Sequence, residues 1–583
     1  MIPLDETFPR TLDDLPPEAT TVWLFEDRAA RAAAERNAAE GGRTIRIRSA
    51  YKTLLHHVLE DGLLDDARRA VIRYPVVPNV AADRFRLECY PLHALVPDCE
   101  IAFVPDLQDG PDLPVYTVET ERGRHRVPVP VRWRAGADGR PVLGACGWLA
   151  RGDAGEPLET EYEAIFARAC AALHALPLDP LDPLDPLDPA EPDGPFFARL
   201  SVEVTLPAAD MPLPVGHERV SLAEAMHEEI YFAGLEIFRR RLSLSPGARN
   251  VRCGQIVPRV LAGGVPGLRM QVATPEVETA DLDDPDLPDL DTVAHWLTPA
   301  QIAGHLDRIG GVPFAGRSRQ GRTIPGRFVA GTGRATLAIS GGQHANESTG
   351  IVGALRAARD LAAEGRASFT VTPLENPDGY AVFRDLCRAR PHDMHHAARY
   401  TASGADLGHA PDCPERDVRN RARAHLPAEV HLNLHGYPSH EWTRPLSGYI
   451  PDGFAGWTIP KGFFLILRHA QDAAALGRVV LDAALGALAA CPEIGAQNRR
   501  MLTLYDRYVS ERAFAVHAGC IPYVTGIEAE ADYPVTLITE APDETIRGEA
   551  FRIAQAAHAR VVRAVAAALG SDRDDEPSLD DSR

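Results

Sequence analysis

SGGQHANESTG, residues 340–350, is the most informative stretch of this chain. Before it, RATLAI (334–339) is apolar and β-branched after its opening arginine, which is typical of a buried strand. After it, IVGALRAARDLA (351–362) has apolar residues at helical spacing, and Asn346 or Ser348 is available as the helix cap. A strand that passes through glycines into a helix indicates the α/β class, in which ligands gather at such junctions.

Polar residues stand at the ends of four strand-like segments in this half of the chain. If the strands run in parallel, their carboxyl ends lie at one edge of a sheet, and residues far apart in sequence meet there. The segments and their polar residues are RATLAI with His344 and Glu347, SFTVTPLENPDGY with the turn at Asn376, AEVHLNLHGYPSH with His435, and YPVTLITEAPDET with Glu540.

Two histidines and one carboxylate form a suitable ligand set for a catalytic Zn²⁺, because three protein ligands leave a fourth position for water. We therefore predict that His344, Glu347 and His435 bind one zinc ion per chain. A further carboxylate that does not bind the metal can take a proton from water and pass it to a leaving group. Glu540 fits this role, and the apolar strand that leads to it predicts that its pKa is raised.

Five segments, in their order along the chain, resemble motifs of the zinc carboxypeptidase family, the carboxypeptidase A/B-like metallopeptidases. They are FAGRSRQGRTI, GGQHANE, LENPDGY, LNLHGY and VTLITEAPDET, within residues 300–555, about half of the chain. The resemblance implies a mixed, mostly parallel twisted sheet flanked by helices. It makes His344, Glu347 and His435 the zinc ligands, and Glu540 the general base for hydrolysis of a C-terminal peptide bond.

The segment that should bind the substrate's terminal carboxylate departs from the family pattern. Where the family has an Asp-Leu-Asn-Arg-Asn-like segment, this chain has GADLGHAPD, with Gly408 and His409 at the Asn and Arg positions. The Arg-Asn pair that clamps a carboxylate is therefore missing from that place. Other candidates for a contact to the carboxylate or to the oxyanion are Arg399, Arg390 and the displaced pair Arg419 and Asn420.

Two further groups of residues near the predicted site have more than one interpretation. The family's flexible tyrosine has three candidates in this chain: Tyr505, Tyr508 and Tyr523. A cluster of three histidines precedes the GADLGHAPD segment: His392, His395 and His396. These residues either support the metal ligands or are ordinary loop residues.

The composition divides the chain into six segments. Two acidic segments rich in proline are expected to be extended linkers, because frequent proline excludes a helix or a central strand, and the acidic C-terminus is expected to be disordered. The segments are an N-terminal α+β region (1–176), a Pro/Asp-rich linker (177–195), a small α+β domain (196–273), an acidic Pro-rich linker (274–294), the zinc carboxypeptidase-like domain (295–570) and the tail (571–583).

The two N-terminal regions contain no chemical motif. RAARAAAERNAAE predicts a helix, and RFRLECY, RHRVPVPVRW and RLSVEVTL predict strands. A second helix is predicted for LAEAMHEEIYFAGLEIFRRR (222–241), which carries His227, Glu228 and Glu229. Because no partner motif accompanies these three residues, we expect them to form a solvated helix face.

Bulk properties restrict the partners and the compartment. The 583 residues carry a formal net charge of −21, which argues against nucleic acid or an acidic membrane as the main partner. The N-terminus lacks the features of a secretory signal, and no apolar run is long enough to span a bilayer. The nine cysteines include no C-x-x-C pair, which favours reduced thiols. We therefore expect a cytoplasmic protein.

Three functions are compatible with these motifs. The first is a carboxypeptidase acting on peptides, and the second is a zinc amidohydrolase acting on N-acyl amino acids or modified peptides. The third is a binding module that has lost zinc and catalysis. Serine hydrolases, thermolysin-like enzymes and P-loop ATPases are disfavoured, because G-x-S-x-G, H-E-x-x-H and G-x-x-x-x-G-K are absent from the sequence.

Overall fold

The computed structural model describes residues 4–110, 113–152, 154–177, 195–245, 248, 250–273, 286–450, 455–528 and 532–571. Most of the predicted linker 177–195, the first part of the linker 274–294 and nearly all of the tail 571–583 therefore lie outside the described residues.

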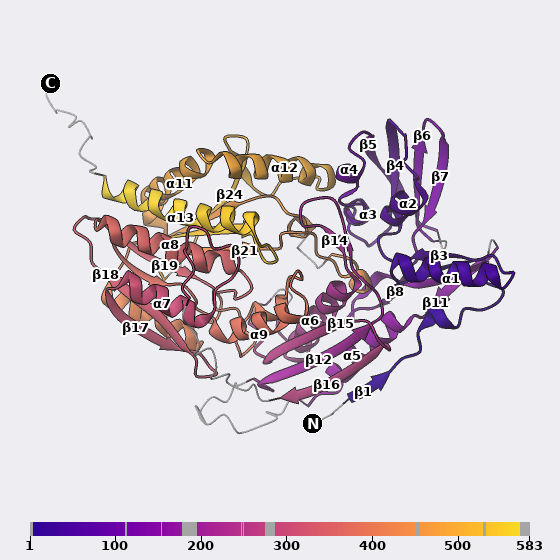
Figure 1. Ribbon diagram of the computed structural model, residues 1–583, viewed down its shortest axis with the longest axis horizontal. Helices are drawn as coiled ribbons and strands as arrows, with labels where there is room; N and C mark the ends of the chain where they lie inside the picture. The colour runs from indigo at the N-terminus through magenta and orange to yellow at the C-terminus, as the bar shows by residue number, and fades with distance from the viewer. Residues whose placement is uncertain are drawn as a thin grey trace.

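A mixed sheet of nine strands, counted among the described residues, forms the centre of the C-terminal half (Figure 1). Its strands, in spatial order, are β17 (Val312–Arg317), β18 (Thr323–Val329), β20 (Ser368–Thr372), β19 (Thr336–Gly341), β21 (Val430–Tyr437), β25 (Val535–Pro542), β22 (Phe464–His469), β24 (Ile521–Ile527) and β23 (Ala515–His517). The four neighbours β20, β19, β21 and β25 run parallel to one another. Of the eight pairings, four are parallel and four antiparallel, so the mixed sheet is confirmed and a parallel majority is not.

Helices pack against this sheet, among them α8 against β19 and β21, and α11 against β22. All eight residues of β21 are buried, which explains its apolar character, because a central parallel strand is covered on both faces. Helices α8 and α13 pack against each other, and α11 packs against α13 (Figure 1). The helices of this half are α7 (Pro299–Ile309), α8 (Ser348–Glu364), α9 (Pro377–Ala389), α10 (Asp417–His425), α11 (Ala474–Ala489), α12 (Pro492–Tyr508) and α13 (Glu549–Gly570).

The N-terminal half contains smaller sheets and six helices among its described residues. The strands are β1 (Leu4–Thr7), β2 (Thr21–Leu24), β3 (Arg46–Ser49), β4 (Arg69–Val76), β5 (Glu100–Leu107), β6 (Val115–Thr120), β7 (Gly123–Pro128), β8 (Val131–Ala135), β9 (Pro141–Ala145), β10 (Gly147–Arg151), β11 (Ala154–Leu158), β12 (Arg199–Leu206), β13 (Met211–Pro212), β14 (Arg219–Val220), β15 (Gln255–Ala262) and β16 (Gly267–Ala273). The helices are α1 (Arg28–Glu40), α2 (Thr53–Asp61), α3 (Arg84–Glu88), α4 (Leu92–Leu95), α5 (Glu161–Ala175) and α6 (Leu222–Arg241).

Most elements predicted for this half are confirmed. Helices α1 and α6 cover the predicted segments, β7 and β8 lie in RHRVPVPVRW, and β12 coincides with RLSVEVTL. The strand predicted for RFRLECY is wrong, because α3 occupies this segment. The apolar residues Phe85 and Leu87 are two positions apart, as in a strand with one buried face. Arg84 and Glu88 are buried as well, so burial in this segment does not alternate and the apolar spacing did not identify a strand.

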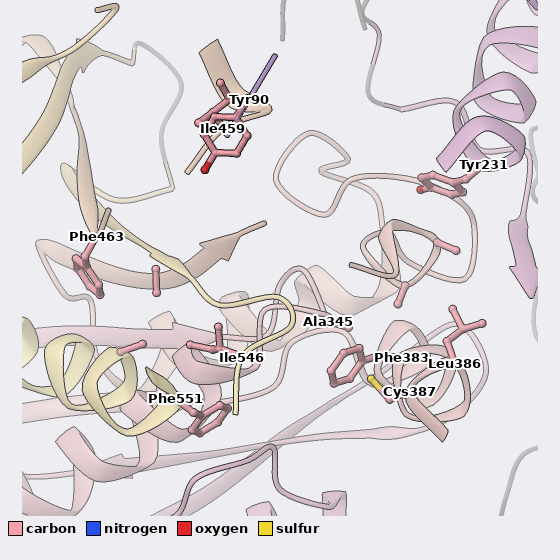
Figure 2. Packing of buried hydrophobic residues seen from close by; sticks show 14 of the residues in the cluster. Tyr90, Tyr231, Ala345, Phe383, Leu386, Cys387, Ile459, Phe463, Ile546 and Phe551 are labelled. Carbon is pink, nitrogen blue, oxygen red and sulfur yellow. The ribbon is translucent and has the colours of Figure 1, made fainter. Parts of the chain in front are cut away.

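The regions on either side of the predicted linkers share one sheet and one core. Strand β1 pairs with β16 in the sheet β1–β16–β12–β15, so the beginning of the chain completes the sheet of residues 196–273. Tyr90, Tyr231 of α6 and Phe551 of α13 belong to a single hydrophobic cluster, part of which Figure 2 shows. The N-terminal half is therefore packed directly onto the half that carries the predicted site.

Membrane-spanning helices are not found within the described ranges. No single helix there is long and apolar enough to cross a bilayer, although the bent pair Gln471–Ala489 and Pro492–Tyr508 meets the length and composition test when its two helices are joined.

Candidate metal centre

His344, Glu347 and His435 meet at the carboxyl ends of β19 and β21. The Nδ1 atom of His344 lies 2.7 Å from Glu347 Oε1, and the Nδ1 atom of His435 lies 2.8 Å from Glu347 Oε2. The two Nδ1 atoms are 3.1 Å apart. The three side chains are buried, with exposures of 6%, 1% and 4%. The parallel strand ends thus bring together residues 91 positions apart, as the sequence predicted.

This group fits a metal ion. Each residue offers one ligand atom, and these atoms all lie within 4.8 Å of one another. No other group of three metal-ligating side chains among the described residues meets this criterion. The group contains two imidazole nitrogens that face each other and one carboxylate. Their lone pairs are directed at one point, and a cation placed there would bind all of them.

The start of α8 leaves the Glu347 carboxylate available. The expected cap from Asn346 or Ser348 is wrong: Glu347 is the N-cap residue, and its side chain makes no capping hydrogen bond. Instead, the backbone N–H of Thr349 donates to Asp543 Oδ2 at 2.9 Å, from beyond the end of β25. Asn346 donates to the carbonyl of Met394. A distant carboxylate therefore satisfies the helix N-terminus, so that Glu347 is free to act as a ligand.

Gly436, the residue after His435, lies against a neighbouring carboxylate. Strand β21 continues to Tyr437, so the backbone does not bend at Gly436. A Cβ atom at Gly436 would lie 1.8 Å from Asp543 Oδ1. The backbone N–H of Gly436 donates to Glu347 Oε2 at 3.0 Å. Glycine is thus required by the close approach of Asp543.

Asp406 supports the first histidine, a contact that the motifs did not reveal. Its Oδ1 atom lies 3.5 Å from His344 Nε2 and accepts a hydrogen bond from the N–H of Gly408 at 3.0 Å. Burial raises the pKa of Asp406, but His344 and His409 lower it more, so that it lies well below its ordinary value. A carboxylate behind one ring nitrogen fixes the other nitrogen as the ligand. The GADLGHAPD segment therefore contributes a carboxylate that lies beside the first histidine of the centre.

Glu540 stands beside the metal centre in register with His435. The two residues are partners in the parallel pair β21–β25, and such partners project to the same face of a sheet. Glu540 is half-buried. Burial and the nearby Glu347 raise the pKa of Glu540 to about 8, against the opposing influence of His435 and Arg399. The direction agrees with the expectation from its apolar strand.

Arg399 is the cationic candidate that reaches the metal centre. It follows the short helix His396–Ala398, and its guanidinium donates to Glu347 Oε1 at 3.3 Å. Its side chain is 24% exposed. Burial lowers the pKa of Arg399, but Glu347 raises it more, so the group stays charged. A positive charge is therefore fixed beside the ligand carboxylate.

Arg419 and Asn420 do not form one clamp. Arg419 is 8% exposed and donates to both oxygens of Glu375, at 2.8 and 2.6 Å. It also donates to Gln343 Oε1 at 2.8 Å. Asn420 is exposed on α10 and accepts a hydrogen bond from Arg423. The Arg419 guanidinium is thus engaged inside the protein, while the Asn420 amide binds a different residue, and a substrate contact from this pair stays a prediction.

Arg390 is similarly engaged. Its guanidinium donates to Asp393 at 2.8 Å and to Asp210 at 2.7 Å, which ties the loop after α9 to the β13–β14 hairpin. Both partners are carboxylates, so the charge of Arg390 is compensated within the protein. The contact of Arg390 to a substrate stays a prediction.

The tyrosine candidates are held in packed surroundings. Tyr508 is 0% exposed, and its hydroxyl accepts a hydrogen bond from the backbone N–H of His93 at 3.0 Å. Tyr505 is 1% exposed, and Tyr523 is half-buried on β24. The ring of Tyr508 packs against Tyr90 of the N-terminal half, and its role in substrate binding stays a prediction.

The loop histidines take three different positions. His396 Nδ1 lies 2.6 Å from Glu228 Oε2 of α6, and His396 Nε2 lies 3.7 Å from Glu544 Oε2. Burial lowers the pKa of His395 to about 3, and His392 is exposed. His396 therefore links α6 to the loop that follows Glu540.

The solvated face predicted for α6 is wrong. His227, Glu228 and Glu229 have exposures of 4%, 0% and 0%. The helix packs against α5 on one side and β15 on another, and residues of the C-terminal half cover what remains. The partners of these side chains lie far away in sequence, such as Ser447, whose N–H donates to Glu229 Oε1 at 3.0 Å. A helix pattern alone could not show this burial.

Two charged groups near the centre escaped the sequence analysis. Lys461 is 2% exposed, and its Nζ lies 4.1 Å from the ring centroid of Trp457, among three aromatic rings. Burial lowers the pKa of Lys461 to about 7. Burial and Glu347 raise the pKa of Glu544 well above its ordinary value. A signal for the lysine was available: Lys52 and Lys461 are the only lysines of the chain, and both are buried.

No family model and no curated protein matches this chain. Among solved structures it is similar to a metallo-carboxypeptidase from Burkholderia cenocepacia, at 14% identity and a TM-score of 0.28, over 52% of this chain and 75% of that one. A metallo-carboxypeptidase from Pseudomonas aeruginosa in complex with (2-guanidinoethylmercapto)succinic acid has 14% identity and a TM-score of 0.29, over 47% and 70%. Thrombin activatable fibrinolysis inhibitor has 11% identity and a TM-score of 0.31, over 53% and 88%.

Proposed function

We propose that this protein is a zinc-dependent metallopeptidase that hydrolyses the C-terminal peptide bond of a peptide. The observation that carries the proposal is the convergence of His344, Glu347 and His435 within 4.8 Å, with Glu540 in register beside His435. Two imidazoles and one carboxylate are typical of catalytic zinc sites, in which the open position takes water or substrate.

The side chains of the centre have distinct tasks in this proposal. A zinc ion held there would polarise the scissile carbonyl and lower the pKa of water to about 7. Glu540 accepts the proton of the attacking water on its carboxylate and delivers it to the leaving amine. Arg399 stabilises the negative charge that develops on the carbonyl oxygen, since its guanidinium already lies within 3.3 Å of Glu347.

Recognition of the substrate carboxylate separates the first function from the second. Arg390 and Arg419 are bound to carboxylates that do not belong to the centre, whereas Arg399 binds the carboxylate of Glu347 and is the predicted cation that lies at the centre. GADLGHAPD also supplies Asp406 to His344 in place of a clamp. These observations favour a zinc amidohydrolase acting on N-acyl amino acids or modified peptides as the second candidate. The complete donor set argues against a binding module that has lost zinc.

Metal analysis and hydrolysis assays on wild type and Glu540→Gln test this proposal. We expect one zinc per chain in both proteins, and a loss of turnover of about 10²–10⁴-fold in Glu540→Gln, the usual contribution of general acid–base catalysis. The matched control is Glu549→Gln, at an exposed position at the start of α13, which should keep wild-type turnover. An active Glu540→Gln protein would contradict the assignment of the base.

The substrates in this assay distinguish the candidate functions. They are peptides with free C-termini, the same peptides with amidated C-termini, and N-acyl amino acids. Cleavage restricted to free peptide C-termini supports a carboxypeptidase. Cleavage of N-acyl amino acids without cleavage of peptides moves the assignment to an amidohydrolase, and equal cleavage of amidated peptides moves it to an endopeptidase. Wild-type protein without zinc would overturn the proposal.

A further inference from the structure

A cavity of 780 Å³ lies between the N-terminal half and the half that carries the metal centre. One wall comes from α4 and β5, a second from the loop between β13 and β14, and a third from α12. Its apolar lining includes Tyr90, Val215, Met501 and Leu504. Each half contributes to the walls, so the cavity exists only because the two halves pack together.

The cavity lies close to the metal centre. Ser439, which lines it, follows the predicted ligand His435 by four residues, and an extended chain spans at most about 3.6 Å per residue. The wall at Ser439 is therefore within about 14 Å of His435. Pro460 lines the cavity as well, and the N–H of the next residue, Lys461, donates to the hydroxyl of Tyr437 at 2.9 Å. Two independent connections thus join the cavity to the strand that carries His435.

The size and chemistry of the cavity suit a short peptide. Its volume lies within the range of about 300–1,000 Å³ found for ligand sites, which often form between domains. The charged residues of the lining balance one another in number: Arg68, Arg500 and Arg507 against Asp98, Glu100 and Glu218. The lining therefore does not select a strongly charged ligand. Apolar walls with both donors and acceptors match a peptide segment, whose backbone carries both.

We propose that this cavity binds the part of a peptide substrate that extends away from the scissile bond. The inference rests on the peptidase function proposed above and gives the N-terminal half the role of a substrate selector. A distance of at most about 14 Å is spanned by four extended residues or fewer, so a hexapeptide bound at the metal centre is long enough to reach the cavity. We assign the cavity to residues beyond the two nearest the scissile bond, so a dipeptide is not expected to use it.

Two tryptophan substitutions, on two different walls of the cavity, test this role. Leu504→Trp narrows the cavity from α12, and Val215→Trp narrows it from the β13–β14 loop. The matched control is Ala496→Trp, at an exposed position of α12 outside the lining. The substrates are a hexapeptide and an N-acetylated dipeptide with the same two C-terminal residues. Zinc content and the midpoint of thermal unfolding are measured for each protein to show that it is folded.

We expect KM for the hexapeptide to rise about tenfold or more in both cavity variants, as the loss of one or two apolar contacts implies. KM for the dipeptide, and kcat for both substrates, should stay within about twofold of wild type, as should every constant of Ala496→Trp. An equal change for the two substrates, or no change for the hexapeptide, would overturn the proposal.

Direct binding separates this inference from the proposed function. If wild type hydrolyses neither substrate, the peptidase proposal fails, and the hexapeptide is titrated calorimetrically into wild type, Leu504→Trp and Ala496→Trp. Binding that only Leu504→Trp weakens about tenfold supports the cavity as a peptide site without catalysis. Absence of binding to wild type, or equal binding to all three proteins, would overturn it.

Discussion

The metal centre (His344, Glu347 and His435) and the α6 cluster (His227, Glu228 and Glu229) contain the same two residue types, and both are buried. In the metal centre, the donor atoms face one another within 4.8 Å. In the α6 cluster, each side chain takes a partner of its own: the carbonyl of Pro258, the ring of His396, and the backbone N–H groups of Leu446 and Ser447. Composition and burial are alike, but the direction of the side chains differs.

This difference shows how buried carboxylates are compensated in the two places. An ionised group removed from water needs hydrogen bonds or an opposite charge. Glu229 has both, since Arg444 lies 3.6 Å away and two backbone N–H groups donate to it. Glu347 faces two imidazoles whose nitrogens lie within hydrogen-bonding distance of its carboxylate, an arrangement that could hold a metal ion. Convergence of donor atoms, more than burial, marks the candidate site.

The strongest test of this comparison removes one histidine from each cluster. His435→Ala deletes a donor from the metal centre, so bound zinc should fall from one per chain to almost none, and hydrolysis by about 10³-fold or more. His227→Ala should retain its zinc, because its imidazole bonds to a carbonyl of the protein. Metal analysis of the two purified proteins measures the zinc bound per chain. Stoichiometric zinc in His435→Ala would mean that the converging group is not the metal site.

A second test should affect stability and leave the metal in place. Glu229→Ala leaves Arg444 without one of its partners and two buried N–H groups unsatisfied, so we expect a loss of about 3–5 kcal/mol in the free energy of unfolding. Arg240→Ala, at an exposed position of the same helix, is the control and should change the free energy of unfolding by about 0.5 kcal/mol or less. Denaturant titration measures both values. Lost zinc in a folded Glu229→Ala protein would count against the distinction between the clusters.

Asp406→Asn tests whether the carboxylate near His344 Nε2 supports this predicted metal ligand. The change removes the negative charge behind His344 Nε2, so zinc affinity should fall about 10–100-fold while the fold is kept. Asp412→Asn, an exposed residue of the same loop, should leave the affinity unchanged. Competition with a zinc chelator measures the dissociation constants. Equal affinities for the two variants would show that Asp406 does not act through His344.

The smallest expected effect is a pH dependence of stability in the metal-free protein. The pKa of Glu540 is raised from 4.5 to about 8, so the folded state holds this proton more tightly than the unfolded chain does. Stability should therefore fall as pH rises from about 4.5 to about 8, and Glu540→Gln should remove about 1 kcal/mol of this fall. Unfolding at several pH values checks the slope. The opposite slope would contradict the raised pKa, and added zinc should reduce the effect, because a nearby cation lowers the pKa.

Much of the C-terminal half was predictable from local patterns. Residues 334–362 have the apolar spacing of a strand followed by a helix, and β19 and α8 lie there. The four strands that carry the polar residues are mutually parallel, so the meeting of His344 with His435 followed from the order of the segments. The start of α9 was predicted as a turn, but Asn376 caps a helix by accepting from the N–H of Gly379. The same side-chain chemistry serves both structures.

The remaining features depended on partners that no local pattern reveals. From the sequence, Arg419 was a reasonable candidate for a substrate contact. The hydrogen bonds from its guanidinium to Glu375 and Gln343 could be seen only in the structure. Asp406 lies in a loop without periodicity, so its approach to His344 had no signal apart from its place in a motif. These side chains are polar in every context, and their role depends on which neighbour lies within hydrogen-bonding distance.

The order of the strand ends, and the ligand types that they carry, were therefore encoded along the chain, because the spacing of apolar residues reports which backbone geometry buries them. The equal division of parallel and antiparallel pairings, the burial of Glu228 and Glu229, and the pairing of β1 with β16 arose only when distant segments packed together. Each of these features is a contact between residues far apart in sequence. Such contacts depend on the shape and charge of two surfaces at once, and neither segment carries that information alone.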